Sequence, residues 1–268
     1  MDLEQRSINV GKALIMDTVR NANSGHTGGP LSSFDFAYVL FKDFLKFDPN
    51  NTEWFDRDRF VLSIGHESAL LYTFLCYIGW LNIEDLKQFR QLGSKTPGHP
   101  ERDVTPGVEA TTGPLGQGVG NAVGMAVSEC ILQSIFGKDI IDHYTYVLHG
   151  DGDIQEPVTQ GAIALAGHWG LGKLIAYYDA NDAQISGKVG RSDSTDYKMM
   201  YESHGWQVIT VDGHNRDEIR SAIRKAQMEY EKPTVIIGET IMAQGCATME
   251  GDHNTHGAPL PPDEIKAT

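Results

Sequence analysis

Two stretches of the sequence decide the fold: Tyr144–Gly152, which reads YTYVLHGDG, and Leu174–Asn181, which reads LIAYYDAN. Each is a short apolar run followed at once by acidic or amide residues, the pattern of a buried strand that ends at a polar loop. The segment between them, 155–169, is expected to be a helix. Strand, helix and strand in this order predict a βαβ unit, in which the two strands are parallel and can be neighbours.

The same alternation continues on both sides of this unit. We expect strands at 59–63, 144–149, 174–178, 207–211 and 234–238, and helices at 4–21, 32–45, 68–78, 82–89, 116–136, 155–169, 195–203 and 216–230. The stretch 93–113 shows little periodicity and is expected to be a long loop of the kind that carries function. No repeat or linker divides the chain. The prediction is therefore one α/β domain over 1–268, a doubly wound, mainly parallel sheet with helices on both faces.

Composition excludes several classes of partner. The chain has 268 residues, with 22 Lys and Arg against 36 Asp and Glu, and a formal net charge of −14. Nucleic acid and anionic membranes bind through Lys and Arg, so neither is expected as a partner. The first residues show no secretory signal, and a cytoplasmic location is expected. A polyanionic ligand would need a metal ion or backbone amides to hold it.

Oxygen-bearing side chains follow the two central strands. Asp151 lies in the GDG of 150–152, and Asn181 ends the DAN of 179–181. The C-terminal ends of parallel strands meet at one edge of a sheet, so both side chains can face one cation. Oxygen ligands suit Mg²⁺ or Ca²⁺, and with two side-chain ligands we favour Mg²⁺ completed by phosphate oxygens and water. Asp-Gly and Asn are also common turn residues at strand ends, and that alternative stays open here.

Histidines form the second group of candidates. Most of the ten have a glycine as a neighbour, which places imidazoles on turns at the ends of helices and strands. Four lie in unusually constrained loops: His26, His66, His99 and His256. Imidazoles near neutrality can donate to a substrate hydroxyl and relay protons, so a cluster of four suits a sugar-like substrate. A single histidine is more often structural, so only the four together point to a site.

Two other phosphate-binding motifs fail on their residues. The segment 167–173 has the glycine and lysine spacing of a P-loop, but Leu174 stands where Ser or Thr is required, and a strand follows instead of a helix. In 116–121 the third glycine comes one place too early for a dinucleotide fingerprint. A nicotinamide-dependent dehydrogenase is therefore not expected.

Seven short motifs follow one another along the chain. They are SGH at 24–26, DRFVLS at 58–63 with the Gly-His of 65–66, TPGHPE at 96–101, TTGPLGQG at 111–118, GDG at 150–152 with the Gln-Glu of 155–156, DAN at 179–181, and HGAPL at 256–260. In this order they resemble the diphosphate-binding N-terminal half of the transketolase family, over nearly the whole chain. The resemblance implies a thiamine-diphosphate-binding fold. It also implies a transferase of the pentose phosphate pathway, which moves a two-carbon ketol unit from a ketose phosphate to an aldose phosphate.

The resemblance also implies a cofactor site. Asp151, Asn181 and the backbone carbonyl of Ala183 would hold Mg²⁺, or Ca²⁺ or Mn²⁺ in its place, against the diphosphate of thiamine diphosphate. Gly152 would contact a phosphate through its amide. Main-chain atoms of one turn would approach the aminopyrimidine ring; the residues of that turn are Gly113, Pro114, Leu115 and Gly116. A plain Gly-Pro turn before a helix is the alternative for that segment.

Catalytic residues follow from the same resemblance. His66 and His256 would line the diphosphate and the reaction centre, and both, with His26 and His99, would contact sugar hydroxyls. Glu156 would keep a carboxylate beside the site, although a glutamate there also suits the start of a helix. Four positions depart from the family pattern and bear on the proton path and the substrate channel: Thr27, Ile64, Pro157 and Gly161.

A partner is implied as well. In the family, a second domain that follows this one holds the pyrimidine ring of the cofactor. The resemblance therefore implies a separately encoded C-terminal subunit in an α2β2 heterotetramer, with sugar phosphates as substrates; a fragment of a longer transketolase would read the same way. Two alternatives stay open: another thiamine-diphosphate enzyme, of the deoxyxylulose-phosphate synthase or 2-oxo acid dehydrogenase type, and a non-catalytic cofactor-binding protein.

Overall fold

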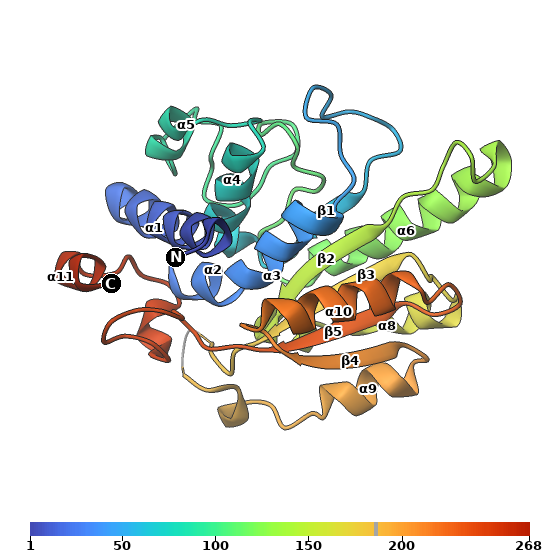
Figure 1. The fold of residues 1–268 in the computed structure, drawn as a ribbon. Helices are drawn as coiled ribbons and strands as arrows, with labels where there is room; N and C mark the ends of the chain where they lie inside the picture. The colour runs from blue at the N-terminus through green and yellow to red at the C-terminus, as the bar shows by residue number, and fades with distance from the viewer. Residues whose placement is uncertain (185–186) are drawn as a thin grey trace.

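The five predicted strands form one parallel sheet. The structure, a computed structural model, describes residues 1–184 and 187–268. Its strands are β1 (Arg59–Leu62), β2 (Thr145–Gly150), β3 (Leu174–Ala180), β4 (Gln207–Asp212) and β5 (Thr234–Glu239). They lie in the order β1-β2-β3-β5-β4, and every neighbouring pair is parallel (Figure 1). The predicted parallel α/β architecture is confirmed.

Helices form much of the remaining chain. They are α1 (Leu3–Ala22), α2 (Gly28–Ser32), α3 (Phe34–Val39), α4 (Ser68–Tyr77), α5 (Ile83–Lys87), α6 (Gln117–Phe136), α7 (Asp151–Gln155), α8 (Pro157–His168), α9 (Tyr197–Ser203), α10 (Arg216–Gln227) and α11 (Pro262–Ala267). Short π or 3₁₀ turns occur at Leu40–Phe44, Gly65–Glu67, Val189–Arg191 and His253–Thr255.

Two predicted helices are divided in the structure, and as single helices they were wrong. The segment predicted as one helix over 32–45 is α2, which already begins at Gly28, then α3 and the π turn Leu40–Phe44. The segment predicted over 155–169 begins at Asp151 as α7 and starts again at Pro157 as α8. Proline has no N–H to donate and fixes φ, so it fits the first turn of a new helix better than the middle of a continuous one.

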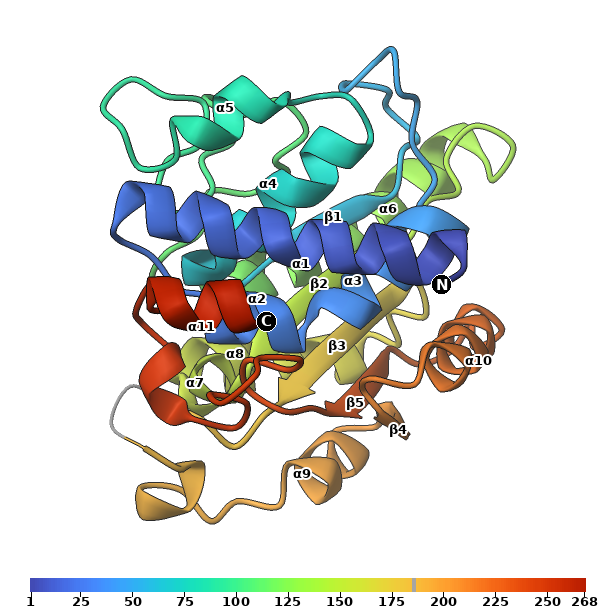
Figure 2. The same ribbon diagram turned by 60° about the vertical axis from the view of Figure 1, so that its left-hand side comes forward.

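Helices cover both faces of the sheet (Figure 2). On one face α6 packs against β1 and β2, α8 lies beside α6, and α9 packs against β4. On the other face α10 packs with α3, and α1 and α4 complete the layer. The chain passes from β3 to β4 and then returns to β5, which lies between these two strands. The step from β4 to β5 therefore runs across the sheet in the opposite direction to the earlier steps. Because such crossovers are right-handed, its helix α10 lies on the face opposite to α6 and α8.

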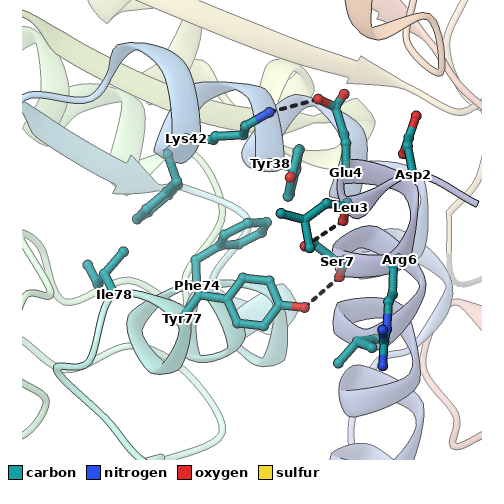
Figure 3. A pocket seen from close by; sticks show the side chains of 12 residues that line it. Asp2, Leu3, Glu4, Arg6, Ser7, Tyr38, Lys42, Phe74, Tyr77 and Ile78 are labelled. Carbon is teal, nitrogen blue, oxygen red and sulfur yellow. Dashed lines mark hydrogen bonds and ion pairs between the residues drawn. The ribbon is translucent and has the colours of Figure 1, made fainter.

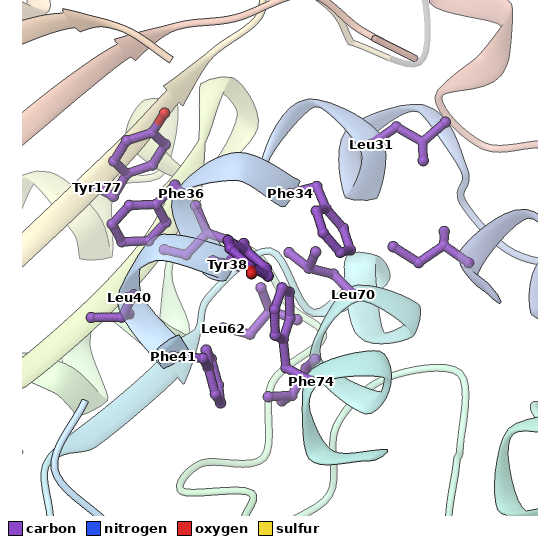
Figure 4. Packing of buried hydrophobic residues seen from close by; sticks show 14 of the residues in the cluster. Leu31, Phe34, Phe36, Tyr38, Leu40, Phe41, Leu62, Leu70, Phe74 and Tyr177 are labelled. Carbon is purple, nitrogen blue, oxygen red and sulfur yellow. The ribbon is translucent and has the colours of Figure 1, made fainter. Parts of the chain in front are cut away.

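The larger core lies under α1, α3 and α4 and is rich in aromatic rings (Figure 4). Phe36 stacks on Tyr177 of β3 with ring centroids 3.9 Å apart. Phe74 of α4 contacts Phe34 and Phe41, each at 5.0 Å. These rings join α3 and α4 to the sheet, and so fix the segments on either side of them that carry His26 and His66.

By length and composition alone, α6 is the one helix of the described segments that would suffice to cross a membrane. In this fold one side of it is buried: Val119, Ala122, Val123 and Ala126 belong to the core on that face of the sheet. A helix that packs on a sheet meets the same two criteria as a membrane span, so length and composition do not separate the two here.

We expect Phe36→Ala to lower the free energy of unfolding by about 3–5 kcal/mol, because it removes a fully buried ring and leaves a cavity against Tyr177. Phe55, which is 57% exposed, provides the control, and Phe55→Ala should change stability by about 0.5 kcal/mol or less. Denaturant unfolding measures both. Equal effects of the two changes would contradict the packing described here.

Candidate functional site

Most of the predicted site residues meet in one cavity. It has a volume of about 460 Å³ and lies at the C-terminal ends of β1, β2 and β3. The predicted residues that line it are His26, His66, His99, Leu115, Asp151, Gly152, Glu156, Asn181, Ala183 and His256. These residues come from segments spread over most of the sequence, so their convergence is a product of the fold.

A larger hollow elsewhere is chemically different. The groove between the start of α1, Tyr38 and α4 has a volume of about 760 Å³ (Figure 3). Its main polar contacts are satisfied within the groove, since Lys42 pairs with Glu4 at 2.7 Å and the Tyr77 hydroxyl donates to the Ser7 carbonyl at 2.6 Å. Convergent titratable groups mark a functional site better than volume does, so the histidine-lined cavity is the candidate.

Three imidazoles of the cavity contact one another. Ring centroids are 4.7 Å apart for His26 and His66, 5.2 Å for His66 and His256, and 5.6 Å for His26 and His256. Burial, with the neighbouring imidazoles and Arg90, lowers the pKa of His26 to about 4 and that of His66 well below its usual value. Burial likewise lowers the pKa of His256. The cluster is therefore neutral at pH 7 and can both donate and accept hydrogen bonds.

Hydrogen bonds hold the His26 segment against the C-terminal part of the chain. The Thr27 hydroxyl donates to the Ala258 carbonyl at 3.1 Å. The next residue, Gly28, accepts a hydrogen bond from the Ala243 amide at 3.0 Å. Thr27, one of the four departures from the family pattern, is fully buried and joins two histidine-bearing segments.

Helix α4 and a glycine contact fix the His99 loop. The Ser68 hydroxyl donates to the Gly98 carbonyl, and the Tyr72 hydroxyl donates to the Pro97 carbonyl, both at 2.9 Å. The turn that begins at Gly113 passes close to the chain at Gly65, where a Cβ atom would lie 2.9 Å from the Gly113 amide nitrogen. Only glycine at position 65 allows this approach, which sets the His66 and His99 segments side by side.

The oxygen ligands of the predicted metal site also lie together. Asp151 is the first residue of α7, directly after β2; its Oδ1 accepts a hydrogen bond from Tyr178 at 2.5 Å, and its Oδ2 is buried with no partner. Burial raises the pKa of Asp151 to about 6. Asn181 follows β3 and accepts a hydrogen bond from the Ala183 amide at 3.0 Å. An orphaned carboxylate oxygen beside an amide oxygen is a donor set that fits a hard cation.

These ligands are too few for a metal site made of protein alone. Among residues 1–184 and 187–268, no group of three His, Cys, Asp or Glu side chains is arranged to hold a metal ion. One carboxylate, one amide oxygen and one carbonyl leave room for oxygen ligands from elsewhere. That is the arrangement expected where a cation also binds phosphate.

The turn 113–116 is only partly exposed to the cavity. Leu115 lines the cavity and covers Gly152, where a Cβ would lie 2.9 Å from its side chain. Gly113 packs on the His99 ring. Gly116 has a positive φ of 80° and donates its amide to Asp153 at 2.5 Å, so that amide faces the protein interior. Gly113, Pro114 and Gly116 are not among the residues that line the cavity.

Glu67 is a cavity residue that sequence reasoning missed. It directly follows His66, is buried, and accepts a hydrogen bond from the Ser33 hydroxyl at 3.2 Å. Burial, together with the nearby carboxylates of Asp179 and Asp153, raises its pKa well above the usual value. The one available signal was a glutamate within a buried strand-to-helix turn, where a charged side chain is unexpected.

The remaining departures lie in different surroundings. Ile64 is buried and lines the cavity, so it narrows the space beside His66. Pro157 begins α8 just after Glu156, which is half-buried at the cavity edge. Gly161 lies on the exposed side of α8, where an added Cβ would meet nothing within 4 Å. Gly161 is therefore outside the cavity.

Comparison with known proteins identifies the family. The model of the thiamine-diphosphate-binding domain of transketolase matches residues 3–268. The chain belongs to the transketolase family. It is 52% identical over 264 residues to transketolase 1 of Pasteurella multocida, a match that covers 97% of this chain and 40% of that protein.

Solved transketolases have the same fold. The structure from Campylobacter jejuni superposes with a TM-score of 0.96 at 46% identity, over 100% of this chain and 42% of that one. A transketolase from Pichia stipitis in complex with sedoheptulose-7-phosphate gives 0.96 at 44%, over 98% and 40%. The predicted thiamine-diphosphate-binding fold is confirmed, and the chain spans about 40% of the length of its transketolase relatives.

We expect His26→Gln to flatten the pH dependence of stability. Above pH 6.5 both folded and unfolded chains hold His26 neutral; as pH falls toward the folded pKa of about 4, only the unfolded chain takes up the proton, and stability is lost. At pH 5 the His26→Gln variant should therefore take up about one proton fewer per molecule on unfolding than the unchanged chain. Urea unfolding at several pH values measures it, and an unchanged slope would show that His26 is charged in the folded chain.

Proposed function

We propose that this chain is the diphosphate-binding subunit of a transketolase. With a partner that holds the pyrimidine ring, it would transfer a two-carbon ketol unit from a ketose phosphate to an aldose phosphate. One observation carries the proposal: in a chain of this family, an unpartnered Asp151 oxygen, the Asn181 amide and a cluster of neutral histidines share one cavity.

The cofactor would be held at the sheet edge. Asp151, Asn181 and the Ala183 carbonyl would bind Mg²⁺, or Ca²⁺ or Mn²⁺ in its place, and the cation with the Gly152 amide would bind the diphosphate. A chain of net charge −14 is expected to repel a diphosphate. A bound cation would supply positive charge at the site and so allow the diphosphate to bind. Thiamine diphosphate, when bound, supplies the carbon centre that receives the two-carbon unit and stabilises the charge that develops on it.

The histidines would bind and orient the sugar. The Nδ1 atoms of His26 and His256 are buried without partners, which leaves them free to bond substrate hydroxyls. The His66 ring contacts both of them, and His99 also lines the cavity. A relative from Pichia stipitis that binds sedoheptulose-7-phosphate supports a sugar phosphate as the substrate. Neutral imidazoles can move a proton to or from a hydroxyl, and Glu156 adds a carboxylate at the edge.

The rest of the enzyme would come from a second subunit. The chain matches about 40% of the length of its transketolase relatives. We propose a C-terminal transketolase subunit that completes two sites in an α2β2 assembly in the cytoplasm. The cavity opens at the edge of the sheet, where such a subunit would cover it.

Reconstitution tests this proposal directly. Mixing the chain with the C-terminal portion of Pasteurella multocida transketolase 1, thiamine diphosphate and Mg²⁺ should produce ketol transfer between sugar phosphates that neither part shows alone. Release of carbon dioxide from pyruvate would instead favour the other thiamine-diphosphate enzymes. Cofactor binding without any turnover would indicate a non-catalytic binding protein.

Asp151→Ala should abolish Mg²⁺-dependent binding of thiamine diphosphate, weakening it more than about 100-fold, beyond what loss of an outer-shell partner usually costs. Asp139→Ala, at an exposed position in the loop after α6, is the matched control and should bind normally. Calorimetry measures both. Unaltered Mg²⁺-dependent binding by Asp151→Ala would show that the cation site is misplaced.

A further inference from the structure

Asp179 is a fully buried carboxylate one residue before the end of β3, and side chains surround it. Its Oδ1 accepts a hydrogen bond from the Thr240 hydroxyl at 2.6 Å. Its Oδ2 accepts one from the Ser32 hydroxyl and one from the Asn181 amide nitrogen, both at 2.7 Å. The hydroxyls come from α2 and from the segment after β5, so Asp179 joins three separate parts of the chain at the sheet edge.

This contact decides which way the Asn181 amide faces. The two ends of an asparagine amide have nearly the same shape, so their orientation is set by hydrogen bonds. Burial raises the pKa of Asp179, but three side-chain donors at 2.6–2.7 Å surround its oxygens and favour its acceptor form. In that form Asp179 binds the NH₂ end of Asn181 and would repel the oxygen end. The oxygen is thereby directed to the opposite side, toward Ala183 and the cavity that Asp151 lines.

The groups that contact Asp179 hold its side chain in place beside Asn181. Thr240 is held beside β3 by its amide, which donates to the Ala180 carbonyl at 3.3 Å. Ser32 ends α2, and its Oγ also lies 2.8 Å from the Gly29 carbonyl oxygen, so the two acceptors share its single hydroxyl proton. Because both hydroxyls belong to packed segments, Asp179 has little freedom to turn away from Asn181.

We propose that Asp179 is a positioning residue that sets the cation affinity of the site by fixing the Asn181 amide with its oxygen toward the cation. This rests on the proposed function, since it presumes that Asn181 Oδ1 binds the cation. Asp179 does not touch the cation. Its role is to remove the amide orientation in which an NH₂ group would face a positive ion.

The test is a calorimetric titration of Mg²⁺ into the chain with thiamine diphosphate at fixed concentration. Asp179→Asn keeps the shape of the side chain but loses the obligatory acceptor, and we expect Mg²⁺ affinity to fall about 10- to 100-fold, as for other outer-shell partners. Asp58→Asn is the matched control. Asp58 is also buried and accepts two amides at 2.8 Å, but it lies just before β1, at the opposite end of the sheet. It should lose stability and keep its Mg²⁺ affinity.

A reversed pair distinguishes positioning from a general structural role. Asn181→Asp alone places two carboxylates in contact and should weaken Mg²⁺ binding. In the double variant Asp179→Asn/Asn181→Asp the donor and acceptor exchange places, so one oxygen of residue 181 is again turned to the cavity. If the two changes acted independently, the double variant would show the sum of the two losses in binding free energy. We expect its Mg²⁺ affinity to be at least about tenfold higher than that sum predicts.

Four outcomes would overturn the inference. Wild-type Mg²⁺ affinity in Asp179→Asn, or additive losses in the double variant, would do so while leaving the proposed function intact. Failure of the unchanged chain to bind thiamine diphosphate with Mg²⁺ would overturn both. If Asp179→Asn does not fold, Thr240→Val, which removes one donor to Asp179, should weaken Mg²⁺ binding severalfold relative to Thr240→Ser; equal affinities would contradict the inference.

Discussion

The parallel pairing of β2 with β3 is the constraint on which the site depends. In this register Gly150 lies opposite Asp179, so both strands end at the same level of the sheet. Asp151 begins α7 directly after one strand, and Asn181 follows the other. A shift of one residue would turn every side chain of a strand to the other face and separate these two groups. The histidine-bearing loops then close over an edge that this pairing has fixed.

Burying carboxyl groups at that edge is costly unless each is given donors or loses its charge. Asp153 accepts hydrogen bonds from Ser63 and the Gly116 amide, and Asp179 accepts three from side chains. Burial raises the pKa of Glu67 well above its usual value, which favours its neutral form. Asp151 differs, since one of its oxygens is buried without any partner. The neighbouring buried acids all have hydrogen-bond donors. The unpartnered oxygen of Asp151 therefore marks the position where a ligand would bind.

The sequence predicted a large part of this. All five strands and the gathering of Asp151 and Asn181 at one edge follow from short apolar runs that end in polar residues. The histidine cluster was a weaker prediction, because nothing local places His26 beside His256; the crossovers and the contact from Thr27 to Ala258 do. These are long-range contacts, which a pattern of apolar spacing does not contain.

Other features could not be predicted for physical reasons. The insertion of β5 between β3 and β4 depends on sheet topology and not on the composition of any strand. The break between α7 and α8 reflects a proline within an otherwise helical pattern. The protonation state of Glu67 depends on three-dimensional burial and on carboxylates far away in sequence. The predicted roles of the site residues, those of the turn 113–116 and of Glu156 included, remain predictions.

One measurement tests the central claim most directly: an anomalous difference map from crystals of the chain grown with thiamine diphosphate and Mn²⁺. The account predicts one strong peak within roughly 2.0–2.6 Å of Asp151 Oδ2 and Asn181 Oδ1, the range for hard cations on oxygen, with the diphosphate on its other side. A bound cofactor whose metal peak lies away from these two atoms would contradict it.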